Sequence, residues 1–333
     1  MNLAELEERL SIFCKHHFND DELELKNVRN MPGHAGFSYG FDVDSSNQES
    51  RWYIRLPPPN VNWRGTADVL RQVEVLNALD ETNVPHCSVT WSGAELEWFG
   101  CPYFIVPFME GDVLHVGPDG WAASLSEEQL YALGKQVMRA LVEVHHVDIA
   151  KVPYLGDPVP FDEDVLRWDR FYERAADPHL LSRVPECRQK LLDHLPTSTR
   201  VGIFHGDFQT SNLFCSKDGR LRAIIDWELT GVGATLNDVG WICTFADPHA
   251  WAMDRSERPM FLDPETLSKY YEEYFGQSLP DISWFRALAA YKFAIITGFN
   301  LSLHRRGKRP DPTWEQTALS MTPLIDRALE LLG

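Results

Sequence analysis

The sequence predicts an α+β fold of two lobes, a small β-rich N-terminal lobe followed by a larger, mostly helical C-terminal lobe. Before about residue 108, short runs of alternating apolar residues indicate strands, whereas after it apolar residues recur at helical spacing. The length of 333 residues also exceeds what one small hydrophobic core needs. We therefore expect one unit over residues 1–108 and a second over 109–333, joined near Phe108-Met109-Glu110-Gly111.

The N-terminal part opens with an amphipathic helix over residues 2–17, whose apolar side chains share one face: Leu3, Leu6, Leu10 and Phe13. Apolar-alternating runs at 37–43 and 52–56 flank a turn-rich segment, which predicts a β-hairpin with a longer loop. Residues 66–80 predict a second helix, with Thr66 as its N-cap. Further short strands are expected at 88–91, 95–98 and 103–107.

Helical spacing dominates the C-terminal part, and one strand-rich island interrupts it. The predicted helices cover residues 126–147, 162–175, 179–194, 263–276, 282–304 and 313–331. The island at 201–226 contains three short strands, at 201–204, 213–215 and 221–225. Lys217-Asp218-Gly219-Arg220 is a favourable hairpin turn between the last two.

Composition and charge exclude several classes of partner. The net charge of −18 is spread over both parts, which argues against nucleic acid or an anionic membrane. The acidity is compatible with a cationic substrate, although a need for solubility accounts for it as well. There are no signal-peptide features at the N-terminus, no uninterrupted apolar span and no C-x-x-C pair among the six cysteines. We therefore expect a cytoplasmic protein and leave monomer and homodimer open.

The strand island carries polar side chains that fit phosphoryl transfer. This reaction needs a carboxylate that positions the acceptor hydroxyl and takes its proton, and oxygen ligands for Mg²⁺. Asp207 follows a strand, Asn212 lies five residues later, and Asp226 ends the next hairpin. We expect Asp207 to act as the base, and Asn212 and Asp226 to hold the metal. Gly206 would let the loop turn sharply beside them.

The spacing of these residues resembles a known catalytic loop. His205-Gly206-Asp207 followed by Asn212 matches the H-R-D-x-x-x-x-N loop of protein kinases, with Asp226-Trp227-Glu228 in place of D-F-G. The glycine in place of arginine makes the segment similar to the aminoglycoside phosphotransferase and choline kinase superfamily, whose fold is protein-kinase-like. The resemblance covers roughly residues 25–305 and implies ATP, Mg²⁺ and a small hydroxylated substrate in the C-terminal lobe.

The resemblance also implies supporting roles in and around this loop. His205 would brace the loop by hydrogen bonds instead of acting as the base. Asp238 matches the structural aspartate that caps a helix and braces the same loop, although Ala234 and Thr235 depart from the residues usual before it. Glu228 would touch a second metal or a substrate amine, or form a hydrogen bond within the loop.

The resemblance further places the nucleotide in the N-terminal lobe. Residues 32–39 would form the phosphate-covering loop, with contacts from Gly33, Gly36 and Ser38. The adenine-contacting strand and hinge would cover residues 103–110, including Phe108 and Glu110. Ordinary hairpin turns also contain glycines, so the loop alone is a weak signal.

Arg55 stands where this superfamily usually has the lysine that contacts the nucleotide phosphates. Arginine keeps the charge and can bind phosphate oxygens bidentately, although the two residues are not interchangeable. Glu74 on the following helix would hold Arg55, unless it is a solvated surface charge. Trp52-Tyr53-Ile54-Arg55 is similar to a strand of the phosphotransferase domains associated with acyl-CoA dehydrogenases, as is the segment from Trp284 to Gly307.

The acceptor remains open at the level of sequence. One candidate is a hydroxylated acyl compound or other metabolite, and the other is an aminoglycoside-like amine. Carboxylates lining the cleft would favour the amine, whereas arginine or apolar residues would favour the metabolite. A third possibility is a nucleotide-binding pseudokinase, against which the retention of Asp207, Asn212 and Asp226 argues. The basic run Arg305–Arg309 is either a solvated helix end or a patch for an anionic cofactor tail.

Overall fold

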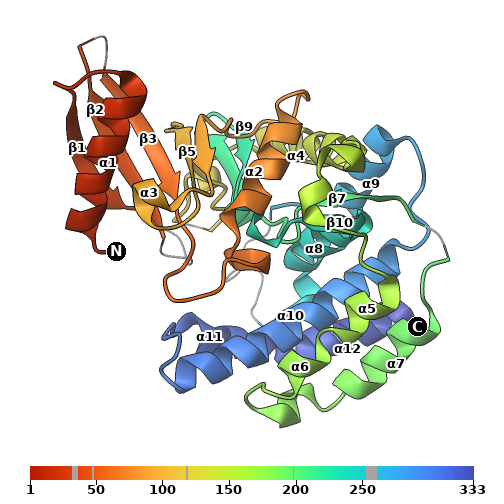
Figure 1. Cartoon of the computed structure of the whole chain (residues 1–333). Coiled ribbons are helices and arrows are strands. Elements are labelled where there is room, and N and C mark those ends of the chain that lie inside the picture. Colours follow the sequence, from red (N-terminus) through yellow and green to blue (C-terminus); the bar gives the residue numbers. More distant parts are fainter. Residues whose placement is uncertain (32–36, 47–48, 118, 198, 253–260) are drawn as a thin grey trace.

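The computed structural model describes residues 1–333 apart from 32–36, 47–48, 118, 198 and 253–260. It contains a small lobe built on an antiparallel sheet and a larger, mostly helical lobe (Figure 1). The predicted fold class is therefore confirmed.

The sheet of the N-terminal lobe contains five strands among the described residues, in the order β1-β2-β3-β5-β4. Their bounds are β1 (Glu24–Asn30), β2 (Ser38–Asp44), β3 (Glu49–Arg55), β4 (Trp91–Gly93) and β5 (Tyr103–Pro107). Helix α1 (Leu3–Phe18) lies along the outer side of this sheet, and α2 (Val69–Leu79) follows β3 in the chain (Figure 1). The predicted first helix and the hairpin of β2 and β3 are confirmed.

Two local predictions in this lobe are wrong. Residues 95–98 are no strand, because α3 (Leu96–Phe99) is a single helical turn. Gly100 ends that turn with φ +70°, and its N–H donates to the carbonyl of Leu96. Thr66 does not cap α2; the carboxylate of Asp68 accepts from the N–H of Leu70 instead, which places the helix start later than predicted.

The described helices of the C-terminal lobe are α4 (Glu127–His146), α5 (Phe161–Leu166), α6 (Asp169–Tyr172), α7 (Val184–Asp193), α8 (Leu236–Ala246), α9 (Pro264–Phe275), α10 (Ile282–Arg305), α11 (Thr313–Thr317) and α12 (Met321–Leu332). Helix α10 packs against α8 and α12 in the centre of this lobe, and α4 packs against α9. In the chain that the structure describes, no helix is both long and apolar enough to cross a bilayer.

Several predicted helices are shorter than the apolar pattern suggests. Residues 179–194 give a 3₁₀ turn and then α7, and 313–331 give α11, a second 3₁₀ turn and α12. Pro185 and Pro323 lie in the first turns of α7 and α12, where a missing backbone N–H costs nothing. Residues 162–175 likewise divide into α5 and α6. Sequence patterns did not predict α8.

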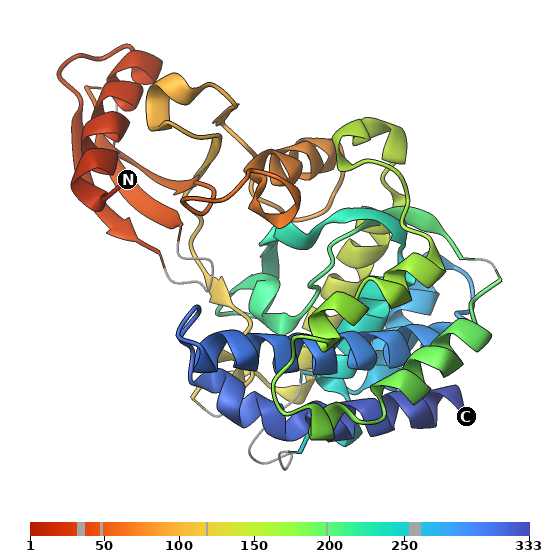
Figure 2. The same cartoon turned by 60° about the horizontal axis from the view of Figure 1, so that its bottom comes forward.

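Short strands position the predicted catalytic segment, residues 201–228, between the lobes. Strand β7 (Val201–Phe204) pairs antiparallel with β10 (Gly231–Ala234), whose glycine-rich stretch was not predicted as a strand. Strands β6 (Asp112–Val113), β8 (Leu213–Ser216) and β9 (Arg220–Ile224) form a second small sheet, with the predicted hairpin turn between β8 and β9. The loops that follow β7 and β9 carry Asp207 and Asp226. Figure 2 shows the green-to-turquoise strands of this segment between the N-terminal lobe and the long blue helices of the C-terminal lobe.

Candidate active site

Asp238 anchors the loop that follows β7. It lies in the first turn of α8 and is fully buried. One carboxylate oxygen accepts from the backbone N–H of His205 at 2.7 Å, and the other accepts from that of Gly206 at 2.8 Å. His145 Nε2 adds a contact of 3.1 Å to the same carboxylate. A buried carboxylate with three partners fixes the backbone of the loop.

His205 is engaged through both ring nitrogens. Its Nε2 lies 2.8 Å from the carbonyl oxygen of Ile225, and its Nδ1 lies 3.2 Å from the N–H of Asp207. Because a carbonyl can only accept and an N–H can only donate, these contacts assign the neutral tautomer with hydrogen on Nε2. The ring therefore has no nitrogen left for a substrate, and it links the two loops of the site.

Gly206 occupies a position that only glycine fits. Its φ is +86°, and a Cβ built there would lie 2.4 Å from the carbonyl oxygen of Leu229. Both the conformation and the close approach of backbone require the missing side chain.

We expect Gly206→Ala to destabilise the protein by about 2–4 kcal/mol, because backbone strain and a clash act together. Gly219→Ala is the matched control, since Gly219 has φ +81° but its added Cβ would meet only Leu125 at 3.5 Å. The free energy of unfolding from urea titration measures both variants. An equal loss in both would show that the contact with Leu229 contributes nothing.

Asp207 is held by three donors. Trp241 Nε1 and Gln209 Nε2 each donate to Oδ1 at 2.8 Å, and Asn212 Nδ2 donates to Oδ2 at 2.9 Å. Three donors fix the rotamer of this carboxylate, and a group that orients an acceptor hydroxyl needs a fixed position. The sequence analysis missed Gln209 and Trp241 as partners of Asp207, since Trp241 comes from α8, 34 residues further along the chain.

Asp226 and Asn212 lie next to each other at the end of the small sheet. The backbone N–H of Ile225 donates to the carbonyl of Asn212 at 3.0 Å. Asp226 has φ +61°, and its shielded Oδ1 has no hydrogen-bond partner. The amide nitrogen of Asn212 binds Asp207, and no described residue donates to its side-chain oxygen. An unsatisfied carboxylate oxygen and an unengaged amide oxygen are donors that suit Mg²⁺.

The described residues contain no cluster of three or more His, Cys, Asp or Glu that could hold a metal by themselves. Mg²⁺ does not require one, because it is usually bound by one or two carboxylates together with water and substrate phosphates. The residues present therefore fit this ion.

The structure corrects the predicted partner of Arg55. The side chain of Glu74 accepts from the backbone N–H of Tyr154 instead of binding Arg55. Arg55 Nη2 lies 2.8 Å from Glu228 Oε2 and 3.8 Å from Asp226 Oδ1. The pKa of Glu228 is raised to about 7, chiefly by burial and next by the charge of Asp226, whereas Arg55 opposes both. The ion pairs of Arg55, the side chain predicted to bind phosphate, thus link the sheet of the N-terminal lobe to the segment that follows β9.

The other residues predicted to bind nucleotide are placed unevenly. Gly33 and Gly36 lie outside the described residues. The hydroxyl of Ser38 accepts from Arg55 Nη1 at 2.8 Å, so Ser38 lies beside the side chain predicted to bind phosphate. At the hinge, Arg51 stacks on Phe108 at 4.5 Å and binds Glu110 at 2.7 Å, so the side chain of Glu110 is turned to a neighbouring strand.

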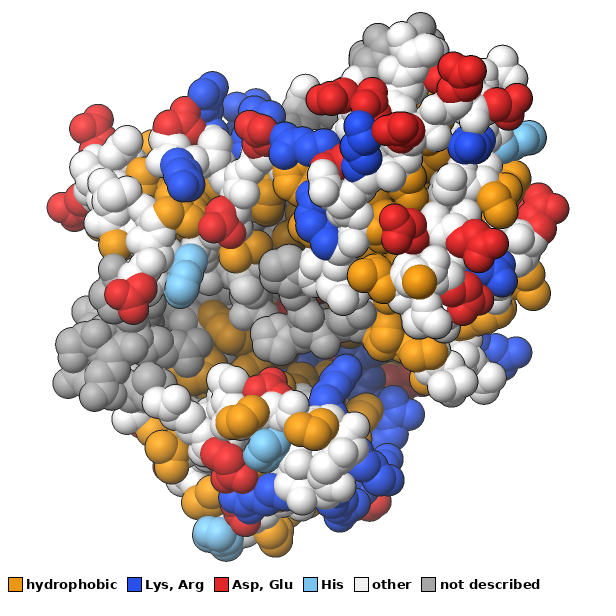
Figure 3. All heavy atoms as spheres, turned by 90° about the vertical axis from the view of Figure 1, so that its left-hand side faces the viewer, with side chains coloured by type: hydrophobic (Ala, Val, Ile, Leu, Met, Phe, Trp, Pro, Cys, Tyr) orange, Lys and Arg blue, Asp and Glu red, His pale blue; other side chains and the backbone are white. Residues whose placement is uncertain are grey.

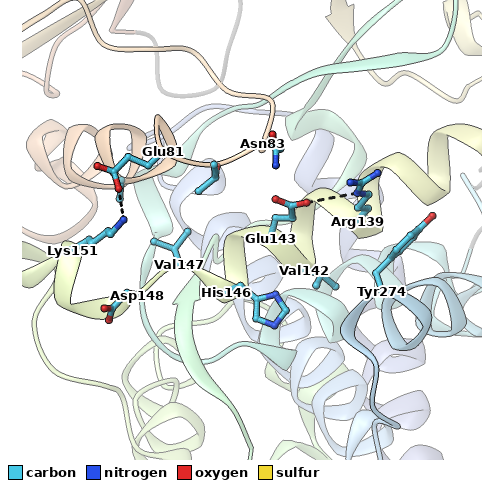
Figure 4. Close-up of a pocket in the computed structure, with 12 residues that line it drawn as sticks. Glu81, Asn83, Arg139, Val142, Glu143, His146, Val147, Asp148, Lys151 and Tyr274 are labelled. Atoms are coloured by element: carbon cyan, nitrogen blue, oxygen red, sulfur yellow. Dashed lines mark hydrogen bonds and ion pairs between the residues drawn. The ribbon is translucent and has the colours of Figure 1, made fainter.

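A cavity of about 360 Å³ lies beside the catalytic loop, and its wall includes Gly206, Glu228 and Trp241. Gly206 precedes Asp207 in the chain and Trp241 binds its carboxylate, so the cavity lies next to Asp207. A second cavity, of about 520 Å³, lies away from this site between α2 and α4 (Figure 4). Ion pairs join Glu81 to Lys151 and Arg139 to Glu143 at its edge, and its wall contains none of the predicted site residues.

Comparisons with known proteins show the family and the fold of the chain. A family model described as "Phosphotransferase enzyme family" matches residues 35–275. The fold superposes on a protein of Ralstonia eutropha JMP134, described provisionally as an aminoglycoside phosphotransferase, with a TM-score of 0.78 at 21% identity, covering 98% of this chain and 97% of that one. Aminoglycoside 2′-phosphotransferase-IIIa in complex with GDP gives a TM-score of 0.63 at 17% identity, covering 98% and 97%.

A curated relative is acyl-CoA dehydrogenase family member 10 of Mus musculus, 24% identical over 286 residues. The match covers 80% of this chain but 26% of that protein, so the chain spans about a quarter of the length of this relative.

Proposed function

Since the chain belongs to the phosphotransferase enzyme family, we propose that it is a small-molecule kinase that transfers the γ-phosphate of ATP to a substrate hydroxyl. The observation that carries this proposal is the fixed carboxylate of Asp207 beside the unsatisfied Oδ1 of Asp226. Phosphoryl transfer needs, within one cleft, a carboxylate that positions the hydroxyl and a ligand for a cation. In this proposal Asp207 is the first and Asp226 the second.

In this proposal Asp207 orients the acceptor hydroxyl and accepts its proton as the oxygen attacks phosphorus. Asn212 and Asp226 would hold Mg²⁺, which neutralises the charge of the transferring phosphoryl group when bound. Arg55 would bind phosphate oxygens, and His205 and Asp238 would keep the loop in place. Most of the rate enhancement would come from positioning and charge neutralisation.

The cross-cleft ion pair predicts how nucleotide binding depends on Glu228. We expect Glu228→Gln to raise the KM for ATP about tenfold with a smaller change in kcat, because Arg55 loses the charge that orients it. Initial-rate kinetics at varied ATP measure this change. Glu74→Gln is the matched control and is expected to change the KM less than twofold, since its partner is a backbone N–H. A larger effect of Glu74→Gln would contradict the correction to the partner of Arg55.

The lining of the cavity bears on the two acceptors that the sequence left open. Its charged residues are Arg71, Arg167, Arg170 and Lys292 against Asp157, Glu228 and Asp238, and aromatic residues such as Trp168 and Phe171 accompany them. Arginine and apolar residues in this place favour a hydroxylated acyl compound or another metabolite over an aminoglycoside. A pseudokinase is disfavoured because the chain retains Asp207, Asn212 and Asp226.

The direct test is a phosphorylation screen with ATP and Mg²⁺ over hydroxylated metabolites and aminoglycosides. ADP release and the ³¹P NMR spectrum of the product identify transfer, and Asp207→Ala serves as the blank. We expect transfer to at least one metabolite that the blank does not support. Stabilisation by nucleotide without turnover on any compound would instead favour the nucleotide-binding pseudokinase.

A further inference from the structure

We propose that the phosphate acceptor is an anionic alcohol, a small molecule whose carboxylate or phosphate group binds Arg71 and Arg170 in the cavity beside Asp207. This inference rests on the proposed function, because it names the class of molecule that Asp207 would activate. It reverses the expectation that an acidic protein would select a cationic acceptor.

Cations outnumber carboxylates in the cavity wall, which contains Arg71, Arg167, Arg170 and Lys292 against Asp157, Glu228 and Asp238. Glu228 binds Arg55, and Lys292 and Arg167 share the single carboxylate of Asp164, at 2.8 Å and 2.6 Å. Asp238 accepts from backbone N–H groups of the loop after β7, which satisfy its oxygens but do not neutralise its charge. Arg71 and Arg170 have no carboxylate partner among the described residues, and Asp157 is exposed.

Arg71 is half-buried and has no carboxylate partner among the described residues. Its guanidinium donates to the carbonyl of Thr230 at 2.8 Å and to that of Leu155 at 3.4 Å. Carbonyls satisfy individual N–H groups but do not neutralise the charge, and an arginine has five such groups. A partly buried cation without a counter-charge favours an anionic ligand, because pairing recovers the cost of its lost hydration.

Arg170 comes from α6, on the opposite side of the cavity from α2. Its guanidinium stacks on Phe171, 4.7 Å from the ring centroid, and it forms no ion pair with any described residue. Stacking restricts the side chain while leaving its edge free for hydrogen bonds, which is how arginine binds carboxylate or phosphate bidentately. Arg71 and Arg170 therefore line the same cavity, although α2 and α6 lie far apart in the chain.

The basic segment 306–309 adds positive charge near the cavity, because Arg309 lies close enough to Glu228 in the cavity wall to act on its charge. Arg305 is held by Asp177 at 2.9 Å and by Glu315 at 2.7 Å, which fixes the start of the segment. Arg306, Lys308 and Arg309 are exposed and have no ion pair within the described structure, and the charge of Arg309 lowers the pKa of Glu228. Figure 3 shows Lys and Arg side chains gathered in the lower part of the view, on the C-terminal lobe. On a chain of net charge −18, this local excess attracts anions to the cleft.

The test uses acceptors that differ only in charge. These are ω-hydroxycarboxylates of three to six carbons, their neutral methyl esters and the corresponding amino alcohols, with glycerol 3-phosphate and glycerol as a phosphate-bearing pair. Product formation with ATP and Mg²⁺ gives kcat/KM for each compound. We expect the anionic member of a pair to exceed its neutral partner by ~10- to 100-fold. The two series separate a carboxylate from a phosphate requirement.

Variants of the two arginines then test the assignment of the site. We expect Arg170→Gln and Arg71→Gln to remove the preference for the anion by raising its KM, with the KM for ATP unchanged. Arg71→Lys, which keeps the charge, should retain part of the preference and guards against loss of folding. Arg174→Gln is the matched control, because Arg174 stacks on Phe299 in the same way but does not line the cavity.

Each outcome of these measurements is decisive. A preference for esters or amino alcohols, or a loss in the arginine variants that is equal for acid and ester, would overturn the inference and leave the kinase assignment standing. If wild type exceeds Asp207→Ala on no compound of any charge, the proposed function fails and the inference with it.

Discussion

Replacing Asp207 by Asn is expected to reduce kcat about 10³-fold while nucleotide affinity changes less than threefold. The substitution removes the carboxylate that we propose as the proton acceptor and leaves a side chain of the same shape. Three donors converge on this carboxylate, from Gln209, Asn212 and Trp241, and an amide can satisfy them only in part. Single-turnover kinetics with the best acceptor from the screen measure the chemical step apart from product release.

Trp241→Phe provides the graded comparison for this prediction. It removes one of the donors to Oδ1 but keeps an aromatic ring in the packing of α8. We expect kcat to fall about tenfold, with little change in the KM for ATP. If Asp207→Asn keeps more than a tenth of wild-type kcat, Asp207 is not the base.

Asp226→Asn is expected to abolish measurable transfer without lowering the stability of the ligand-free protein. In the ligand-free structure Oδ1 of Asp226 accepts no hydrogen bond, and its charge raises the pKa of neighbouring Glu228 through repulsion. Removing that charge therefore sacrifices only the weak attraction to Arg55 at 3.8 Å. In the proposed mechanism activity needs Asp226 as a metal ligand, whereas folding does not.

Thermal unfolding with and without Mg²⁺ and nucleotide separates these two effects. A ligand that binds the folded state stabilises it by about 2.7 kcal/mol at one hundred times its Kd. We expect wild type to gain a magnesium-dependent shift that Asp226→Asn lacks. Asp238→Asn is the contrasting variant, because that buried carboxylate has three partners and its loss should destabilise the protein by about 3–5 kcal/mol. An unfolding temperature for Asp226→Asn as low as that of Asp238→Asn would refute the distinction.

The order of the lobes and the catalytic segment could be predicted because local signals carry them. Strand alternation, helical spacing and the intervals between His205, Asp207, Asn212 and Asp226 are all short-range features. The comparisons confirm the family and the phosphotransferase class, whereas the roles of individual residues remain to be tested by mutation.

Features that depend on contacts between distant segments could not be predicted. The pair of Arg55 and Glu228 joins residues 173 positions apart, and the expected partner Glu74 was chosen from the pattern of the superfamily. The alternating residues at 95–98 suggest a strand, but Gly100 closes a helical turn there. The wall of the cavity beside the catalytic loop combines residues from α2, α6, α8 and β10, so its charge could not be predicted from any one segment of the sequence.

The packing of α2 has a consequence for regulation. Although α2 belongs to the first lobe by chain order, its side chains Val69, Val73 and Leu76 share the hydrophobic core of the second lobe, whereas α1 and the outer face of the sheet form a core of their own. Hydrogen bonds from Arg71 to Thr230 and from Tyr154 to Asp68 fasten the helix further. An inactive state produced by swinging this helix outward would break that core. We therefore expect a constitutively assembled catalyst, in which opening for nucleotide exchange moves the sheet while α2 stays in place.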